Sequence, residues 1–518
     1  MASALLTAPA RRRPRPAARL NLSEVLLDDQ LRRHGDRAAI RRPGGALSYG
    51  ALASDMGAAA ALLVERGVER GDVVALALPD GPRWCATFLA VVRIGAVAAS
   101  VSLALPKERA RQALGRARPR LVITDRPDLA DIAPSAGSSE LDAAIRARLS
   151  DPGPAGTRAC DACYLLLTSG STGPSKWAIH GHGDIPACIA TYGRRILRLT
   201  PQDTTWSVAA LATSYGLGNS LYFPLGAGGA AWIDGETPTP AGLARACREG
   251  AVTAAFGVPT FWARVARHAK EGRVARSDLA GISLAVSAGE PLPPAVWRDV
   301  RAATGLLLVD GLGSSEATNL YVSHGRGSPA AGSVGWVVPG YSVRIAESRE
   351  GEPGCGELLV RGPTVMAGYV GDPDASSRAL AGGWLHTGDI VRRNPDGALA
   401  VVGRVGDRFK AGGLFVDPAR VAAALTEDPE IAEAVAVGVP DRTGILRVVA
   451  VVVLAEGRIP GGAAATQAVL TRARSRLAAH EVPRAVVVVT ALPTTPTGKA
   501  HRQEILRLAA AALAREAA

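Results

Sequence analysis

The feature that most constrains the fold is a long alternation of apolar helical stretches with short strands rich in β-branched residues. It runs from Asn21 to about Val402, and strand-like Val73–Leu78, helix-like Trp84–Ile94 and strand-like Arg120–Thr124 are successive examples. Residues Ala251–Phe256 repeat the strand pattern further along the chain. Such alternation is typical of α/β proteins in which helices cover a largely parallel sheet. The sequence therefore predicts a large, multi-layered N-terminal α/β domain over this stretch, residues 21–402.

A second domain is expected because the chain has 518 residues, and a single core rarely grows beyond about 250–300 residues. An N-P-D-G turn within Asn394–Gly403 joins two strand candidates. The elements predicted after it are a helix at Pro418–Leu425, strands at Ala432–Val439 and Val448–Leu454, a helix at Ala465–Ala479 and a strand at Ala485–Val489. This order predicts a small α+β domain at residues 408–518, joined to the first by a hinge at residues 403–407.

The formal net charge of +12 raises the alternative of a nucleic-acid-binding protein. Five arginines lie in the first 20 residues, and no acidic residue precedes Glu24. The remaining excess of positive charge is distributed over the rest of the sequence, with no basic stripe interleaved with aromatic residues. Nucleic acid is therefore not expected as a partner. We expect residues 1–20 to be a disordered basic leader, although an arginine-rich, acid-free start also suits an organellar presequence.

Neither a membrane span nor a disulfide framework is expected. The longest apolar run is interrupted by Arg93 and does not reach the roughly 18 residues that a membrane-spanning helix needs. The six cysteines are scattered and no signal peptide is evident, so a reduced, cytoplasmic protein is predicted. Cys160 and Cys163 form a C-x-x-C pair without a second pair, which disfavours a structural zinc site.

The strongest chemical signal is the segment L-L-L-T-S-G-S-T-G-P-S-K at Leu165–Lys176. An apolar strand here runs into a loop whose glycines let backbone N–H groups converge on an anion, while hydroxyls add donors and the lysine adds a countercharge. A Walker A loop needs Gly before this lysine and Ser or Thr after it, but Ser175 and Trp177 stand there. The segment predicts a phosphate-binding loop of another kind.

This segment resembles the phosphate loop of the acyl-adenylate-forming superfamily, which includes acyl-CoA synthetases, luciferases and adenylation domains. Four more of the superfamily's segments occur in its order: D-G-L-G-S-S-E at Asp310–Glu316, G-W-L-H-T-G-D at Gly383–Asp389, G-R-V-G-D-R-F-K-A-G-G-L-F-V at Gly403–Val416 and L-P-T-T-P-T-G-K at Leu492–Lys499. The chain is therefore identified as a member of this superfamily, and the resemblance spans residues 22 to 505. It implies ATP and Mg²⁺ as cofactors.

The resemblance also assigns roles in the nucleotide site. Lys499 would bridge the acid's carboxylate and the α-phosphate, Ser315 would donate to the α-phosphate, and Glu316 would be the Mg²⁺ ligand, because hard cations prefer carboxylates. The residues expected to hold the β- and γ-phosphates are Thr168, Ser169, Gly170, Ser171, Thr172, Gly173 and Lys176. Asp389, assisted by Arg404, would accept from the ribose hydroxyls. The residues expected around adenine are Gly289, Glu290, Pro291, Asp310 and Gly311, and Leu312 is assigned to both the nucleotide and the acid.

Domain movement is implied as well, since Lys499 belongs to the small domain and the phosphate loop to the large one. Superfamily members rotate the C-terminal domain between adenylation and thioester formation. The hinge position holds Gly406 here, which lowers the cost of large φ/ψ changes but cannot stabilise one state by its charge. In the second state, Lys410–Phe415 would replace Lys499, and Gly412 and Gly413 would let the backbone approach the pantetheine arm of CoA.

Three further stretches resemble benzoate-CoA ligases: Y-G-L-G-N at Tyr215–Asn219, G-V-P-T at Gly257–Thr260 and S-A-G-E-P-L-P at Ser287–Pro293. They imply ATP-dependent activation of a benzoate- or cinnamate-like acid to acyl-AMP, then transfer to the CoA thiol. The expected acid pocket comprises Tyr215, Gly216, Asn219, Val258, Pro259, Ala288, Leu312, Gly313 and Asn319. Benzoate-activating relatives often carry His at the position of Asn319, so a hydroxyl- or amino-substituted acid, paired with Tyr215 and Asn219, is one interpretation.

Other functions stay open at this point. The same adenylation could load an acyl-carrier protein, whose acidic surface would suit this basic chain, or AMP could activate another small oxyacid such as nitrite. A catalytically silent scaffold is a further alternative, but the presence of Lys499, Glu316 and Asp389 argues against it. The absence of a G-x-S-x-G segment disfavours an α/β-hydrolase. The oligomeric state is not predicted.

Overall fold

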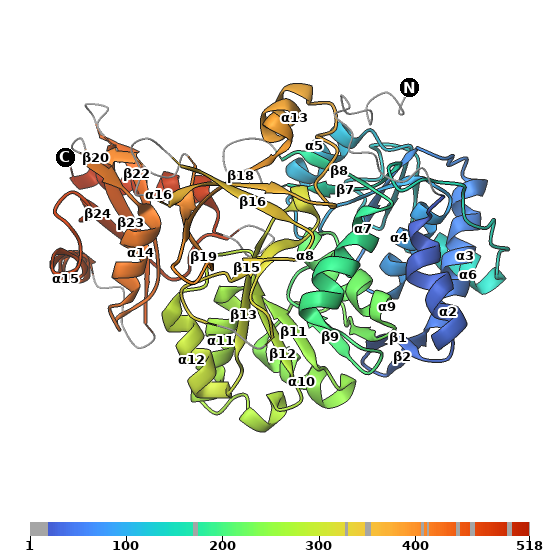
Figure 1. The fold of residues 1–518 in the computed structure, drawn as a ribbon, viewed down its shortest axis with the longest axis horizontal. Helices are drawn as coiled ribbons and strands as arrows, with labels where there is room; N and C mark the ends of the chain where they lie inside the picture. Colours follow the sequence, from blue (N-terminus) through green and yellow to red (C-terminus); the bar gives the residue numbers. More distant parts are fainter. Residues whose placement is uncertain are drawn as a thin grey trace. The chain divides into compact units, whose positions relative to one another are not determined.

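The computed structural model describes residues 19–168, 175–326, 330–347, 354–405, 409–411, 414–441, 446–455, 462–494 and 500–516 (Figure 1). The chain divides into two compact units. The first comprises Met1–Val343 and Val360–His386, and the second comprises Arg344–Leu359 and Thr387–Ala518. In the part of the chain that is described, no helix has both the length and the apolar character needed to cross a membrane.

The larger sheet of the first unit has nine strands. Their spatial order is β15 (Trp336–Val337), β14 (Leu320–Ser323), β13 (Leu308–Gly313), β12 (Leu284–Ala288), β11 (Ala254–Gly257), β9 (Thr204–Ser207), β10 (Ala230–Trp232), β1 (Ala38–Arg42) and β2 (Gly45–Ser48). Strands β13 to β1 in this order are parallel, and the pairs at both edges are antiparallel. Figure 1 shows α10 (Pro240–Gly250), α11 (Pro259–Lys270) and α12 (Pro294–Thr304) beside strands β11–β13. Trp206, Trp232 and Trp262 contribute to the core between this sheet and its helices.

The smaller sheet of the first unit has six strands. Their order is β6 (Ser135–Ala136), β5 (Leu121–Thr124), β3 (Val73–Ala77), β4 (Val97–Ser100), β7 (Ala162–Leu167) and β8 (Trp177–Gly181). Only the last pair is antiparallel. Every residue of β3, β4 and β5 is buried, as expected for parallel strands covered on both faces. The strands predicted near residues 73–78 and 120–124 are confirmed.

The remaining helices of the first unit follow the predicted alternation. The longer ones are α3 (Tyr49–Glu65), α4 (Pro82–Arg93), α5 (Lys107–Ala117) and α6 (Ser138–Ala147). The short helical segments are η1 (Glu24–Asp28), α2 (Asp29–His34), α7 (Asp184–Cys188), η2 (Ile189–Leu197), α8 (Ser214–Leu217), η3 (Gly218–Tyr222), α9 (Phe223–Ala227), η4 (Arg276–Leu279), η5 (Ser315–Ala317), α13 (Pro373–Ala379) and η6 (Ala381–Gly383). Helix α4 confirms the helix predicted at 84–94. The two sheets and their helices together confirm the predicted α/β class of this part of the chain.

The second unit begins with a four-stranded sheet ordered β16 (Ser342–Glu347), β17 (Cys355–Arg361), β18 (Leu385–Arg393) and β19 (Leu399–Arg404). Strands β18 and β19 form the antiparallel hairpin that the N-P-D-G turn predicts, and Asn394 N–H donates to the Ala398 carbonyl at 2.8 Å. This sheet assigns residues 344–359 and 387–402 to the second unit, whereas the sequence placed them in the large domain. The hinge at 403–407 remains a prediction, and residues 406 and 407 lie outside the described part.

The rest of the second unit is built on a three-stranded sheet. It contains β22 (Ile431–Pro440), β23 (Leu446–Leu454) and β24 (Ala485–Val489), preceded by the two-stranded β20 (Phe409–Ala411) and β21 (Leu414–Val416). Helices α14 (Pro418–Thr426) and α15 (Gly462–Arg474) share one core with the sheet, and α16 (Arg502–Glu516) shares another. Alternate residues of β23 enter the two cores, because successive side chains of a strand point to opposite faces. Helix α15 ends five residues before the predicted Ala479, and α16 was not predicted.

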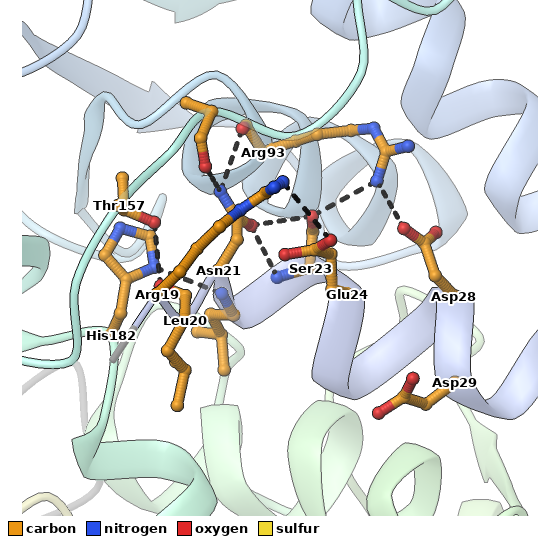
Figure 2. A network of polar contacts seen from close by, with 12 residues as sticks. Arg19, Leu20, Asn21, Ser23, Glu24, Asp28, Asp29, Arg93, Thr157 and His182 are labelled. Carbon is orange, nitrogen blue, oxygen red and sulfur yellow. Dashed lines mark hydrogen bonds and ion pairs between the residues drawn. The ribbon is translucent and has the colours of Figure 1, made fainter. Parts of the chain in front are cut away.

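A buried polar network ties the start of the described chain to the first unit (Figure 2). Asn21 Nδ2 donates to the Val92 and Arg93 carbonyls at 3.1 and 3.0 Å. Arg93 is 6% exposed, and its guanidinium forms ion pairs with Asp28 at 2.9 Å and Asp151 at 2.6 Å. Unpaired burial of such a charge would cost several kcal/mol, so the ion pair with Asp28 holds the N-terminal segment on α4 and the pair with Asp151 fixes the chain after α6. The predicted leader, residues 1–20, is described only at Arg19 and Leu20, and Leu20 N–H donates to the Thr157 carbonyl at 2.8 Å.

His182 completes this attachment. Its Nδ1 accepts from Leu22 N–H at 3.1 Å, which places the ring proton on Nε2. Burial lowers the pKa of His182 to about 4, below the usual value near 6.5. Because the unfolded chain binds this proton more readily, the stability contributed by neutral His182 is present above about pH 6.5 and is lost as the pH falls toward 4.

We therefore predict a pH-dependent difference between the wild type and His182→Gln, which keeps an acceptor for Leu22 N–H but does not titrate. Between about pH 7 and pH 5, the free energy of unfolding of the wild type should fall by about 2 kcal/mol relative to the variant. Urea denaturation of both proteins at the two pH values measures this difference. Parallel pH profiles would show that His182 does not couple protonation to folding.

Candidate functional site

The base of the predicted phosphate loop is the β7–β8 hairpin. Leu167 pairs with Trp177, and the next residues close the loop because Thr168 N–H donates to the Lys176 carbonyl at 2.8 Å. Lys176 N–H approaches Thr168 Oγ1 at 3.4 Å. Residues 169–174, which include Ser169, Gly170, Ser171, Thr172 and Gly173, lie outside the described part. The hairpin brings both ends of the loop to the carboxyl end of β7, the edge at which α/β sheets bind ligands.

Trp177 explains why the residue after Lys176 departs from the Walker A pattern. Its side chain is buried in the core of the six-stranded sheet, and Nε1 donates to the Ala113 carbonyl at 2.8 Å. The residue after Lys176 therefore packs inward and is not placed to add a hydroxyl ligand. This agrees with the exclusion of a Walker A loop from the sequence.

Glu316 lies in a short 3₁₀ turn, η5, directly after β13. The turn is followed by Thr318, whose φ of 66° and ψ of −43° are rare for a β-branched residue. Such a conformation costs on the order of 1–3 kcal/mol and persists only where the surroundings enforce it. The backbone that carries Ser315 and Glu316 is thus held in a strained conformation.

Buried hydrogen bonds supply this constraint. His180 Nε2 donates to the Ser315 carbonyl at 2.8 Å, and its Nδ1 lies 3.0 Å from Asp184 Oδ2. Thr318 Oγ1 lies 3.1 Å from His180 Nδ1 and 3.1 Å from the Tyr164 hydroxyl. The Tyr164 and His180 rings stack with centroids 5.1 Å apart. Because Tyr164 and His180 belong to β7 and β8, this network fixes the Glu316 turn to the hairpin that carries the phosphate loop.

Two opposite charges meet at Tyr369. The Tyr369 hydroxyl donates to Glu316 Oε1 at 2.9 Å, and Lys176 Nζ lies 5.0 Å from the centroid of the Tyr369 ring. Burial and the neighbouring carboxylate of Glu316 raise the pKa of Tyr369, so the hydroxyl stays protonated at neutral pH. Lys176 and Glu316, predicted separately from the sequence, are thus brought together by a residue that the sequence analysis did not select.

These residues fit a Mg²⁺ ion delivered with a polyphosphate. The described residues contain no group of three or more His, Cys, Asp or Glu side chains placed to hold a metal. Mg²⁺ commonly uses one or two carboxylates together with substrate phosphates and water, and Glu316, partly exposed, has a second carboxylate oxygen beyond the one that Tyr369 contacts. The donor set therefore suits a metal that shares its ligands with a nucleotide.

The predicted adenine residues lie on two neighbouring strand ends. Ser287 pairs with Asp310 and Ala288 with Gly311, so the segments S-A-G-E and D-G-L-G end side by side. Gly289 has φ of 91°, a conformation that favours glycine. Asp310 is buried, burial raises its pKa, and its Oδ1 accepts from Gly311 N–H at 2.9 Å. The structure brings Gly289 and Glu290 near Asp310 and Gly311, although their contact with adenine remains a prediction.

The predicted acid-pocket residues follow the carboxyl ends of parallel strands β9, β11, β12 and β13. Tyr215 and Gly216 lie in α8, and Asn219 lies in η3. Val258 and Pro259 stand at the start of α11, and Ala288 ends β12. Leu312 and Gly313 end β13, and Asn319 directly precedes β14. Gly216 is required sterically, because a Cβ there would lie 2.0 Å from the Ala210 carbonyl oxygen. The Tyr215 hydroxyl donates to the Gly257 carbonyl at 3.4 Å.

The two asparagines of this set differ. Asn319 Nδ2 donates to the Tyr222 hydroxyl and its Oδ1 accepts from Leu320 N–H, both at 2.9 Å. These two bonds fix the orientation of the Asn319 amide within the first unit. Asn219 is fully buried, and among the described residues neither atom of its amide has a hydrogen-bond partner.

The residues predicted to bind ribose lie in the second unit. Asp389 and Arg404 are cross-strand partners in the β18–β19 hairpin, and Arg404 Nε lies 3.0 Å from Asp389 Oδ1. Arg404 also donates to the Thr387 carbonyl at 3.1 Å. The predicted pair is therefore adjacent, as the assignment requires. Lys410 lies on β20, whereas Lys499, Gly406, Gly412 and Gly413 lie outside the described residues.

Sequence reasoning missed the residues that support the site, namely Tyr164, His180, Asp184, Thr318 and Tyr369. The segment W-A-I-H-G-H-G-D at Trp177–Asp184 contains a usable signal, because polar side chains in an otherwise buried strand require partners. Tyr369 carries no comparable signal, since an isolated tyrosine in a loop is common.

Thr318→Val tests whether the hydroxyl network supports the strained turn. Valine keeps the branched shape but removes Oγ1, leaving buried groups of Tyr164 and His180 without this partner, and we expect a loss of about 1–3 kcal/mol in the free energy of unfolding. Thr318→Ser keeps the hydroxyl and is the matched control, with a smaller expected loss. Chemical denaturation compares the two variants. Equal losses would show that packing of the methyl group, and not the hydroxyl, supports the turn.

Comparison with known proteins gives consistent matches over most of the chain. The model for the AMP-binding enzyme family matches residues 27–370, and that for the AMP-binding enzyme C-terminal domain matches residues 420–499. A benzoate–CoA ligase of Thauera aromatica is 31% identical over 464 residues, which cover 85% of this chain and 87% of that protein. A p-hydroxybenzoic acid–AMP ligase of Mycobacterium tuberculosis is 34% identical over 447 residues, and this match spans 62% of that longer protein. The crystal structure of an anthranilate CoA ligase in complex with anthranoyl-AMP superimposes with a TM-score of 0.88 at 26% identity, covering 96% of this chain and 99% of that one.

Proposed function

Because the chain belongs to the AMP-binding enzyme family, we propose that it is an acid–thiol ligase that activates an aromatic carboxylic acid with ATP and transfers the acyl group to CoA. The observation that carries the proposal is the convergence of Lys176 and Glu316 on Tyr369 at the base of the phosphate loop. A cation and a carboxylate with a free oxygen, placed together beside such a loop, suit the polyphosphate of ATP. Relatives named for benzoate, 4-hydroxybenzoate and anthranilate support an aryl acid as the substrate.

The first half-reaction joins two anions. A carboxylate oxygen of the acid attacks the α-phosphorus of ATP, the bond to the β-phosphate oxygen breaks, and pyrophosphate leaves with that electron pair. Repulsion between the carboxylate and the phosphates must be offset, which preorganised donors and cations do most effectively. Lys176 and the loop would hold the β- and γ-phosphates, and Ser315 would donate to the α-phosphate. Mg²⁺, held by Glu316, would neutralise phosphate charge when bound.

The second half-reaction breaks the mixed anhydride. The CoA sulfur attacks the acyl carbonyl carbon, its proton is lost to solvent, and AMP leaves with the electrons of the carbon–oxygen bond. Asp389 and Arg404 would retain the ribose of the adenylate through both steps. We propose that Lys499 serves the first half-reaction and that the segment containing Lys410, Gly412 and Gly413 serves the second.

One observation favours a second candidate, in which the adenylate is delivered to a carrier protein instead of CoA. The relative at 34% identity is named a p-hydroxybenzoic acid–AMP ligase, and this chain spans only 62% of its length. The adenylating part of such a protein would share the site described above. The two candidates differ only in the thiol acceptor.

We propose a cytoplasmic location because the cysteines form no disulfide. All six are free, and four of them are buried. A protein without disulfides is suited to a reducing compartment.

Pyrophosphate release with a panel of substituted benzoates and cinnamates, measured with and without CoA, tests the function. We expect turnover that depends on both an aryl acid and CoA, with the thioester detected by mass spectrometry. Adenylate that accumulates despite CoA would favour the carrier-protein candidate. No release with any acid would refute both.

Lys499→Ala is predicted to lower the rate of adenylation by at least about 10²-fold, because a preorganised charge at the reacting phosphate is lost. Thioester formation from synthetic acyl-AMP should stay within a few-fold of the wild type. Lys270→Ala is the matched control, since Lys270 is a surface lysine paired with Asp299 at 3.1 Å. Equal loss of both half-reactions would contradict separate use of Lys499 in the first step.

A further inference from the structure

The segment that carries Tyr369 is held firmly against β8. Ala367 N–H donates to the Ile179 carbonyl, and Ile179 N–H donates to the Gly368 carbonyl, both at 2.9 Å. Val370 N–H donates to the Trp177 carbonyl, also at 2.9 Å. The Tyr369 N–H donates to Ser376 Oγ of α13 at 2.8 Å. Backbone hydrogen bonds on both sides of Tyr369 therefore fix the direction in which its side chain leaves the chain.

That side chain contacts both charged groups of the proposed polyphosphate site. The hydroxyl occupies one oxygen of Glu316 at 2.9 Å, and the ring face receives the Lys176 ammonium 5.0 Å from its centroid. Among the described residues, Lys176 forms no ion pair. Lys176 and Glu316 contact the same side chain, and without it the two opposite charges would attract each other.

We propose that Tyr369 is a positioning residue that keeps Lys176 and Glu316 apart and ready for Mg·ATP. The ring holds the ammonium by a cation–π contact that a phosphate oxygen can replace. The hydroxyl fixes the Glu316 carboxylate through one oxygen and leaves the other for the metal. This inference rests on the proposed function, since it assumes that these two charges serve ATP and Mg²⁺.

The roles of the Tyr369 hydroxyl and of the Tyr369 ring can be tested separately. Tyr369→Phe keeps the ring and removes only the bond to Glu316, so it should weaken the response to Mg²⁺. Tyr369→Leu removes the ring as well, so it should also weaken ATP binding in the absence of the metal. A residue that merely fills space would affect stability but not the dependence of ATP affinity on Mg²⁺.

Calorimetric titration with ATP at a series of Mg²⁺ concentrations, with no acid present, provides a readout other than turnover. We expect Tyr369→Phe to raise the Kd for Mg·ATP by about 10-fold, the scale of one hydrogen bond to a charged group, and to leave the Kd for ATP in EDTA unchanged. The Kd for AMP, which lacks the β- and γ-phosphates, should stay within about 2-fold. Tyr49→Phe is the matched control, because the buried Tyr49 hydroxyl donates to the Gly229 carbonyl at 2.8 Å, away from these residues.

Unchanged Mg²⁺ dependence in Tyr369→Phe, or equal weakening of AMP and Mg·ATP binding, would overturn the inference. A double-variant comparison keeps it testable if one protein is unstable: in a Glu316→Gln background, Tyr369→Phe should have no further effect on the Mg²⁺ response. Binding of Mg·ATP to the wild type distinguishes failure of the proposed function from failure of the role of Tyr369. A wild type that binds no Mg·ATP would refute the proposed function, whereas one that binds normally while Tyr369→Phe also does would refute the role of Tyr369 alone.

Discussion

The candidate site depends on the buried hydrogen bonds of His180. One ring nitrogen binds the Ser315 carbonyl and the other faces Asp184 and Thr318. A three-residue 3₁₀ turn followed by a threonine at positive φ has little reason to persist alone. Because the side chains of His180, Asp184 and Thr318 are buried, breaking a bond among them would leave a donor or acceptor without water. The network therefore holds Glu316 in one place at the expense of local backbone strain.

This network also joins the two sheets of the first unit. Tyr164 and His180 belong to the six-stranded sheet, whereas Ser315 and Thr318 follow a strand of the nine-stranded sheet. Each sheet presents loops at the carboxyl ends of parallel strands, and ligand sites in α/β proteins gather at such ends. The six-stranded sheet supplies the base of the predicted phosphate loop, and the nine-stranded sheet supplies Glu316 and the residues predicted to line the acid pocket. Neither sheet alone contains the proposed site.

Short segments of this chain encode much of the candidate site. The strand before the loop and the hairpin at the N-P-D-G turn follow from local sequence patterns, and the structure confirms both. The family resemblance implied shared roles for Asp389 and Arg404, and for Gly289 and Asp310, and in each pair the structure places the two residues on neighbouring strands or strand ends. Asn319 was expected to line the acid pocket, and in the structure its amide is hydrogen-bonded to the Tyr222 hydroxyl and Leu320 N–H. The boundary of the second unit differs from the prediction because β16 and β17 pair in one sheet with β18 and β19, which follow about 25 residues later in the chain, and no local pattern reveals this.

The sequence by itself determined the alternation of strands and helices, the chemistry of the loop that ends at Lys176, and the presence of a carboxylate after β13. These properties are local, since hydrophobic periodicity and turn-forming residues act over a few positions. Only the tertiary structure decided that His180 supports Ser315 from 135 residues away and that Tyr369 stands between Lys176 and Glu316. Such partners meet only after the sheets have formed, because a buried polar group bonds to whichever segment the fold brings within about 3 Å.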